Sequence, residues 1–162
     1  MDSNENEIKR FQDNLRTFRK LGGWTTQELG DMVGVTKQTI SNLETKTSKM
    51  SKIQYIALRS VLENEANSDS KNAELLKKAL LVLLDDSKSD EEYADAEKQI
   101  GLAAAAVSGG ASVEAATSLI TAVPVVAGAT VAAATVGVAL APAVVPALLT
   151  GAWLRRITKN DK

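Results

Sequence analysis

An all-α fold is predicted for this chain of 162 residues from three observations. Apolar residues in the first hundred positions recur three and four apart, which is the period of one helix face. Threonine, serine and glycine stand where such helices would begin and end. Near the C-terminus, the 40 residues between Glu114 and Arg155 have no ionisable side chain, and such a run is long enough to cross a membrane as a helix.

The first helix is expected to begin near Ile8 and to stop at Gly22 and Gly23, after six frayed residues. Its apolar face carries Phe11, Leu15 and Phe18. Thr25 or Thr26 can then cap a second helix that ends at Gly34, a position suited to left-handed backbone. This helix is expected to bury Leu29, Met32 and Val33.

A third helix, capped by Thr36, is expected to bury Ile40 and Leu43. After a polar loop, Ser51 can cap a fourth helix. The apolar residues expected to form its buried stripe are Ile53, Ile56, Ala57, Val61 and Leu62. Residues 64–73 then read as a linker.

An amphipathic helix is predicted over residues 73–84 from its leucine-rich face. Residues 85–97 are acidic and are expected to form a solvated connector, with another helix starting near Glu91 and running into an alanine-rich tract. The formal charge is +2 over residues 1–63, −5 over 64–100 and +2 over 101–162. These three ranges are the predicted domains, and their near-zero total makes no case for a nucleic-acid partner.

The order of helices in the first range is more specific than its charge. The segment TTQELGDMVGVTKQTISNLE, residues 25–44, resembles the helix-turn-helix of Cro/CI-type phage repressors and of the wider XRE-family regulators. The matching points include Gly30, the Gly34-Val35-Thr36 turn and Leu43-Glu44, and the resemblance extends over residues 8–63. It implies a lambda-repressor-like fold that binds double-stranded DNA, usually as a dimer on paired half-sites.

A recognition helix needs a polar face for base edges, and the third helix offers Lys37, Gln38, Ser41 and Asn42 at helical spacing. Glutamine and asparagine can bond adenine, and lysine can reach guanine. By resemblance to the family, Lys37, Gln38 and Asn42 would contact bases. By the same resemblance, the phosphate contacts would come from Gln27, Thr39 and Lys46.

The tail is expected to form an Ala/Gly-rich helical hairpin of residues 101–123 and 127–154, turning near Pro124 and inserted in a bilayer. The basic residues that follow, Arg155, Arg156, Lys159 and Lys162, favour a cytoplasmic end. The N-terminus lacks the apolar region of a secretory signal, so the first domain is expected at the cytoplasmic face of the membrane. A single span near 130–154 is an alternative.

The chain has no cysteine and no histidine, which excludes thiol nucleophiles, imidazole bases and Cys/His metal sites. Phosphate-binding and hydrolase motifs are also missing, so no enzymatic activity and no cofactor are expected. The favoured function is a membrane-anchored, sequence-specific DNA-binding protein that acts as an oligomer. The alternatives are a holin-like or pore-forming membrane effector that uses the domain for assembly, and a soluble helical oligomer that buries its tails.

Overall fold

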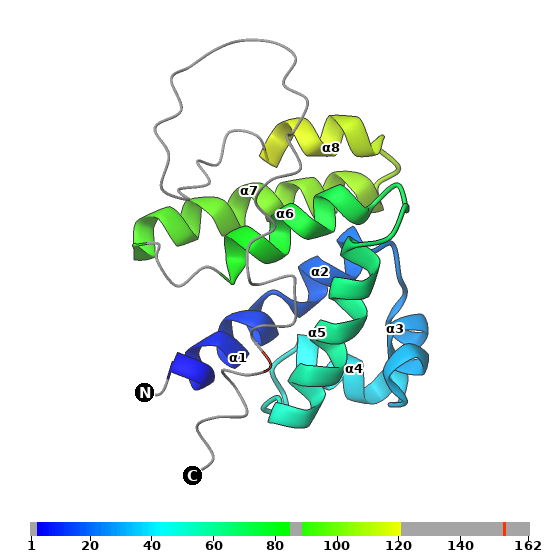
Figure 1. The fold of residues 1–162 in the computed structure, drawn as a ribbon, viewed down its shortest axis with the longest axis vertical. Helices are drawn as coiled ribbons and strands as arrows, with labels where there is room; N and C mark the ends of the chain where they lie inside the picture. The colour runs from blue at the N-terminus through cyan, green and yellow to red at the C-terminus, as the bar shows by residue number, and fades with distance from the viewer. Residues whose placement is uncertain (1–2, 85–88, 121–153, 155–162) are drawn as a thin grey trace.

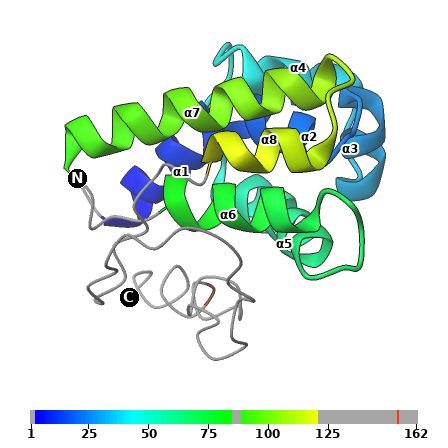
Figure 2. The same cartoon turned by 90° about the horizontal axis from the view of Figure 1, so that it is seen from above.

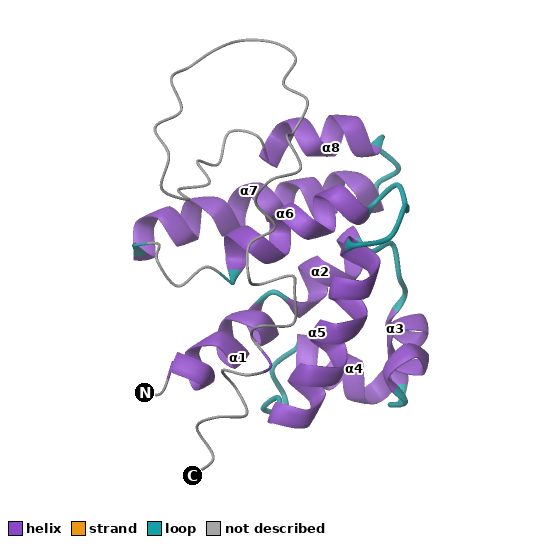
Figure 3. Ribbon diagram, in the orientation of Figure 1, coloured by secondary structure: helices purple, strands orange, loops and turns teal. Residues whose placement is uncertain are grey.

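The computed structural model describes residues 3–84, 89–120 and 154, and within them every regular element is a helix (Figures 1 and 3). The predicted all-α class is confirmed. In chain order the helices are α1 (Ser3–Asp13), α2 (Leu15–Leu21), α3 (Thr26–Val33), α4 (Lys37–Glu44), α5 (Lys52–Ala66), α6 (Ala73–Leu83), α7 (Asp90–Ser108) and α8 (Val113–Ile120).

The helices form two groups in space: α1 to α5 make up one, and α6 to α8 make up the other. Helices α6, α7 and α8 lie side by side with roughly aligned axes and alternating chain directions, and this layer packs on α2 and α5 (Figures 1 and 2). Helices α3 and α4 lie at the opposite end of the molecule from α8 (Figure 1). The layer of α6, α7 and α8 therefore leaves the helix-turn-helix surface uncovered.

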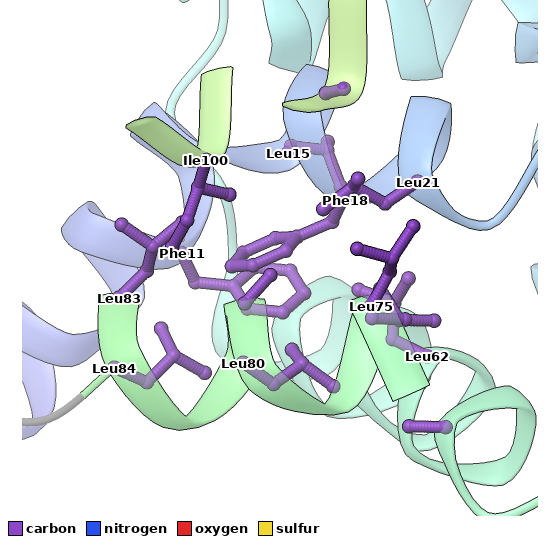
Figure 4. Packing of buried hydrophobic residues seen from close by; sticks show 14 of the residues in the cluster. Phe11, Leu15, Phe18, Leu21, Leu62, Leu75, Leu80, Leu83, Leu84 and Ile100 are labelled. Atoms are coloured by element: carbon purple, nitrogen blue, oxygen red, sulfur yellow. The ribbon is translucent and has the colours of Figure 1, made fainter. Parts of the chain in front are cut away.

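One buried cluster joins the two groups (Figure 4). The Phe11 ring lies edge-on to the Tyr55 ring at 5.0 Å and is tilted against the Phe18 ring at 5.5 Å, measured between centroids. Around these rings lie side chains from α2, α6 and α7: Leu15, Leu21, Leu75, Leu80, Leu83 and Ile100. Each fully buried Leu or Phe side chain contributes about 1.5–3 kcal/mol. Residues of α6 and α7 from the predicted second range, 64–100, thus contribute to the core, while the three-domain division stays a prediction.

The N-terminal helix differs from its prediction in two ways. It begins at Ser3, where frayed residues were expected, and it breaks at Asn14, which separates α1 from α2. The buried Asn14 side chain donates its Nδ2 to the Arg10 carbonyl at 3.0 Å and to the Tyr93 hydroxyl of α7 at 2.7 Å. The break is stabilised by a contact across 79 positions of the chain, which the local apolar period does not report.

Helix α5 buries a different face from the predicted stripe. Ile53, expected inside, is 80% exposed, and only Leu62 of the predicted set is fully buried. The residues that α5 does bury are Tyr55, Leu58, Arg59, Leu62, Glu63 and Ala66. Met32 of α3 was also expected inside, and it is 49% exposed.

The buried face of α5 includes an arginine because its partners are buried with it. The Arg59 guanidinium pairs with the Glu7 carboxylate of α1 and with the Tyr55 hydroxyl, and its Nε donates to Glu63 Oε1 at 3.0 Å. The Tyr55 hydroxyl donates to Glu7 Oε1 at 2.8 Å. Burial raises the pKa of the Tyr55 phenol far above its ordinary value, so the hydroxyl stays protonated and can donate. Since charged residues are rarely buried, the apolar pattern placed this face in solvent.

The predicted amphipathic helix is present as α6, and the expected leucine-rich face is buried: Leu75, Leu76, Ala79, Leu80, Leu83 and Leu84. The expected single helix over residues 101–123 is wrong. Helix α7 ends at Ser108, and α8 begins at Val113 after a turn in which Gly110 has φ +88°. Ala104 of α7 and Ala116 of α8 are buried in the protein core, which accounts for a folded-back pair in place of one long helix.

The other predictions for the tail lie outside the described residues: the second arm at 127–154 and the turn near Pro124. Leu154 is partly buried and packs against the core cluster. Among the residues that the structure describes, no helix combines the length and the apolar character that a bilayer crossing requires.

Candidate nucleic-acid interface

Helix α3 is started by reciprocal bonds at Thr25. The Thr25 hydroxyl accepts from the Glu28 backbone N–H at 3.2 Å, and Glu28 Oε2 accepts from the Thr25 N–H at 2.7 Å. This capping box satisfies two backbone donors that the helix leaves unpaired. The hydrogen bond from the Thr25 backbone lowers the pKa of the Glu28 carboxyl. Of the two threonines expected to cap this helix, Thr25 is the one that does so.

The turn between α3 and α4 depends on two glycines. Gly34 has φ +73°, a left-handed conformation that favours glycine, as predicted. Gly30 allows α3 to approach the turn closely, because a Cβ atom there would lie 2.7 Å from the Val35 carbonyl oxygen. The Val35 N–H donates to the Gly30 carbonyl at 2.9 Å, which sets the direction in which α4 leaves.

Helix α4 is capped by Thr36, whose hydroxyl accepts from the Thr39 N–H at 3.2 Å. Ile40 and Leu43 are buried, as predicted, and they orient the helix on the core. Lys37 and Gln38 are exposed on its first turn. The helix therefore presents a polar side to solvent while its apolar side holds it in place, which is what a reading helix requires.

Two side-chain hydrogen bonds lie on the exposed surface of these helices, one on α4 and one on α3. The Gln38 Nε2 donates to Asn42 Oδ1 at 2.8 Å within α4. The Gln27 Nε2 donates to Asp31 Oδ1 at 2.7 Å within α3. Each bond joins residues four apart and limits the orientations of exposed side chains before any ligand arrives. A glutamine or asparagine held in this way loses less side-chain entropy on binding a base or phosphate.

A shallow groove brings together four of the seven predicted DNA contacts: Gln27, Lys37, Gln38 and Thr39. Asp31, Gly34, Val35 and Thr36 also line it. Of the remaining three, Ser41 and Asn42 are half-buried further along α4, and Lys46 lies beyond the end of that helix. The roles of all seven residues stay predictions.

Lys46 has an unusual position. It has φ +60°, in the left-handed region that few residues other than glycine adopt, and it follows Thr45, the residue that caps the end of α4. Its Nζ lies 2.7 Å from Asp13 Oδ1, and its side chain is 58% exposed. The ammonium group can therefore meet a phosphate, but Asp13 offsets part of its charge.

Sequence reasoning missed the contacts that hold α4 in place. Arg19 of α2 pairs with Glu44, with the closest atoms 2.5 Å apart, so Glu44 anchors the end of α4 to the core. Gln12 of α1 donates its Nε2 to the Leu43 carbonyl at 3.0 Å and to the Ser48 carbonyl at 2.7 Å. The spacing of polar residues in the sequence contains no signal for either pairing.

No metal site accompanies this groove: among the described residues no three acidic side chains gather where they could hold an ion. Asp31 is the acidic residue of the groove, where it faces the same space as Lys37. A carboxylate there repels phosphate oxygens, while it can accept a hydrogen bond from a cytosine amine. The groove therefore combines base-edge chemistry with only a modest positive charge.

Residues 15–63 match the family model described as helix-turn-helix. The matched range is less than half of the chain and includes α2, α3, α4 and most of α5. No significant match to this chain was found among curated proteins or among solved structures. The family match supports a DNA-binding regulator and suggests double-stranded DNA as its partner. Residues 15–63 are therefore a helix-turn-helix domain of the XRE family, in agreement with the resemblance of residues 25–44 to the Cro/CI-type repressors.

Proposed function

We propose that this chain is a sequence-specific DNA-binding protein, a transcriptional regulator or a DNA tether, and has no enzymatic role. Helix α4 enters the major groove and reads base edges through Lys37, Gln38 and Asn42. The observation that carries this proposal is the groove between α3 and α4, where four of the predicted contacts from both helices face one space. Gln27, Thr39 and Lys46 bind phosphates and set the register of the helix.

The bonded pair Gln38–Asn42 supports a preference for adenine. Their mutual bond uses the Gln38 amide nitrogen and the Asn42 carbonyl oxygen. The Gln38 oxygen can accept from the adenine N6 amine, and the Asn42 nitrogen can donate to adenine N7. The two residues then act together as one bidentate reader, and losing either one disturbs both bonds.

A membrane anchor is the second element of the proposal. The 40 residues between Glu114 and Arg155 have no ionisable side chain, and four basic residues follow them. Residues of α7 and α8 pack in the core, so we propose that the lipid-binding part begins after Ile120. The chain would then lie at the cytoplasmic face of the membrane, with its helix-turn-helix domain in the cytoplasm.

The DNA-binding proposal is tested by selecting a binding sequence from random duplexes with the full chain and then measuring affinities by fluorescence anisotropy. Gln38→Ala should lose about 1–3 kcal/mol of preference for the selected sequence over a scrambled one. Lys46→Asn, which keeps a residue that tolerates left-handed backbone, should weaken both sequences alike and reduce the salt slope by about 1. Lys71→Ala, in the turn before α6, is the matched charge control.

Equal affinity of the wild type for selected and scrambled DNA would contradict the proposed specificity. The anchor needs a separate experiment, namely membrane fractionation of the full chain beside a truncation after Ile120. This truncation keeps α7 and α8 and, with them, every described member of the core cluster apart from Leu154. The full chain should stay with membranes through a carbonate wash, whereas the truncation should be found in the supernatant. A full chain released by carbonate would remove the anchor from the proposal.

A further inference from the structure

We propose that Tyr93 of α7 positions Asp13 against Lys46, and that Asp13 thereby withholds part of the Lys46 charge from DNA phosphates. The residues that connect α7 with Lys46 are consecutive at the end of α1: Gln12, Asp13 and Asn14. We call these three residues the α1 end. The inference rests on the proposed function where it concerns DNA affinity, whereas the contact between Asp13 and Lys46 can be followed without DNA.

The α1 end fixes the backbone on both sides of Lys46. The Gln12 Nε2 donates to the Leu43 carbonyl at 3.0 Å and to the Ser48 carbonyl at 2.7 Å. Its Oε1 accepts from the Met50 N–H at 2.9 Å. The Lys46 N–H donates to the Leu43 carbonyl at 3.2 Å, with the residue in left-handed backbone at φ +60°. Because the backbone is held in this way, the direction of the ammonium group is what a neighbouring charge can change.

Asp13 competes with DNA for the Lys46 ammonium group. The Lys46 Nζ lies 2.7 Å from Asp13 Oδ1, and the two side chains are 58% and 27% exposed. A phosphate that binds this ammonium must share it with the carboxylate or displace the carboxylate, which also repels the phosphate. An exposed ion pair contributes little free energy, so DNA can displace it. Since phosphate contacts carry no sequence information, Asp13 should lower the affinity for all sequences alike.

The other side of the α1 end contacts α7. The Asn14 Nδ2 donates to the Tyr93 hydroxyl oxygen at 2.7 Å, and the Arg10 guanidinium lies 4.8 Å from the centre of the Tyr93 ring. Burial raises the pKa of the Tyr93 phenol, and the carboxylates of Glu97 and Asp13 add to this rise. Because such an effect weakens with distance, Asp13 lies near both the Tyr93 side chain and the Lys46 ammonium group.

The helix break makes the position of Asp13 depend on α7. Asp13 is the last residue of α1, and Asn14 has φ −105° and ψ 5° between the two helices. Asn14 is buried, and its amide group donates to the Arg10 carbonyl at 3.0 Å as well as to Tyr93. Loss of the Tyr93 oxygen leaves a buried donor unpaired, and this favours a shift of the break that restores a partner. Asp13 then moves with the break, and Lys46 is released to DNA.

The competition is tested by DNA affinities of the full chain. Asp13→Asn should raise the affinity for selected and for scrambled duplexes by about two- to fivefold, the range expected for an exposed ion pair. The gain should shrink as salt is added, because exposed charges are screened. Asp95→Asn removes the same charge from an exposed position of α7 and is the matched control. Equal gains from the two variants, or no gain from Asp13→Asn, would overturn the inference.

Tyr93→Phe tests the positioning role, because it removes the hydroxyl and keeps the ring. It should raise the affinity for both duplexes by about twofold in the wild-type background and should add nothing in the Asp13→Asn background. Damage to the fold alone would lower the affinity in both backgrounds. A lowered affinity, or the same factor in both backgrounds, would show that Tyr93 does not act through Asp13.

A zero-length carbodiimide cross-link measures the Asp13–Lys46 contact without DNA. In the full chain, the cross-linked peptide pair should be found by mass spectrometry, and Tyr93→Phe should lower its yield by about twofold, in line with the gain in affinity. An unchanged yield would overturn the positioning role of Tyr93, and a wild type without this cross-link would overturn the contact itself. If the wild type binds no duplex, the proposed function fails, and the cross-link still decides whether Tyr93 holds Asp13 on Lys46.

Discussion

The helix-turn-helix unit α3–α4 and the contact between α1 and α5 are stabilised in opposite ways. In α3–α4 the caps at Thr25 and Thr36 bond residues three positions away, and these bonds are exposed to solvent. Between α1 and α5 the buried Arg59 pairs with Glu7, 52 positions earlier in the chain. One region depends on many weak local bonds, and the other depends on a few buried charges whose partners must all be present.

The two regions therefore have different roles: one presents side chains for binding, and the other supports the core. Exposed local bonds fix the backbone of α3 and α4 and still leave Lys37 and Gln38 facing solvent for a ligand. The buried charges contribute no binding surface, but they join the start of the chain to α5 and so support the core on which α4 rests. Substitutions should therefore have their largest effect at the α1–α5 contact and smaller effects toward the caps.

The largest effect is expected for Arg59→Ala. This change leaves the buried carboxylates of Glu7 and Glu63 without their partner, and breaking a buried pair in this way costs about 3–5 kcal/mol. The free energy of unfolding from urea titration followed by circular dichroism measures it. Arg16→Ala, at an exposed position of α2, is the control and should change stability by less than about 0.5 kcal/mol.

Removing the carboxylate charges as well should recover much of this loss. Arg59→Met combined with Glu7→Leu and Glu63→Leu leaves no charge in the buried site, and replacement of a buried charge cluster by apolar residues of similar volume is often close to neutral. An Arg59→Ala variant within about 1 kcal/mol of wild type, with no further gain from the triple variant, would show that water reaches the α1–α5 contact.

The second-largest effect is expected where Gly30 of α3 lies close to the turn between α3 and α4. Alanine is the better helix former, yet Gly30→Ala places a Cβ atom 2.7 Å from the Val35 carbonyl oxygen. Since that atom is backbone, the turn must shift, and we expect a loss of about 1–3 kcal/mol, the range for overpacking. Thermal unfolding measures this loss, and DNA affinity should fall with it because α4 moves.

Gly101→Ala in α7 is the matched control, because outside its own helix no described residue lies within 4 Å of a Cβ atom built at that glycine. There the helix preference of alanine should dominate and stabilise the protein by about 0.5–1 kcal/mol. The two glycine variants should therefore differ in sign. A stabilising Gly30→Ala would mean that the turn adapts to the added methyl group.

The same contrast explains what could be predicted from the sequence. The helices of residues 25–44, their caps and the left-handed Gly34 were predicted correctly, because each signal lies within four residues of its effect. The break at Asn14 and the exposed Ile53 were missed. Both depend on partners far along the chain, Tyr93 for Asn14 and Glu7 for the rotation of α5.

The same contrast, between local signals and distant partners, applies to the candidate site. The resemblance at residues 25–44 placed Gln27, Lys37, Gln38 and Thr39 on one surface, and the structure brings these four into one groove. It did not reveal that Asp13 lies against Lys46, because Asp13 is on α1. A family pattern predicts the positions of contacts, whereas the charge that a contact retains depends on neighbours that the pattern does not include.

A smaller effect is expected for Thr36→Ala at the start of α4. The change removes the hydroxyl that accepts from the Thr39 N–H, and losing such a cap costs about 1 kcal/mol. Thr36→Ser keeps the hydroxyl and should stay close to wild type in urea unfolding. Equal stability of the alanine and serine variants would show that water replaces the cap at this exposed helix end.

The smallest effect is a pH dependence at the α3 capping box. The lowered pKa of Glu28 means that its carboxylate stabilises the folded state above the ordinary carboxyl value of 4.5. That contribution is lost as the pH falls through the lower folded-state pKa, where the carboxylate takes up a proton. Wild type should thus be more stable than Glu28→Gln at neutral pH, and the difference should shrink in acid. Unfolding curves for both proteins across this range measure it, and a constant difference would mean that the box depends on geometry and not on charge.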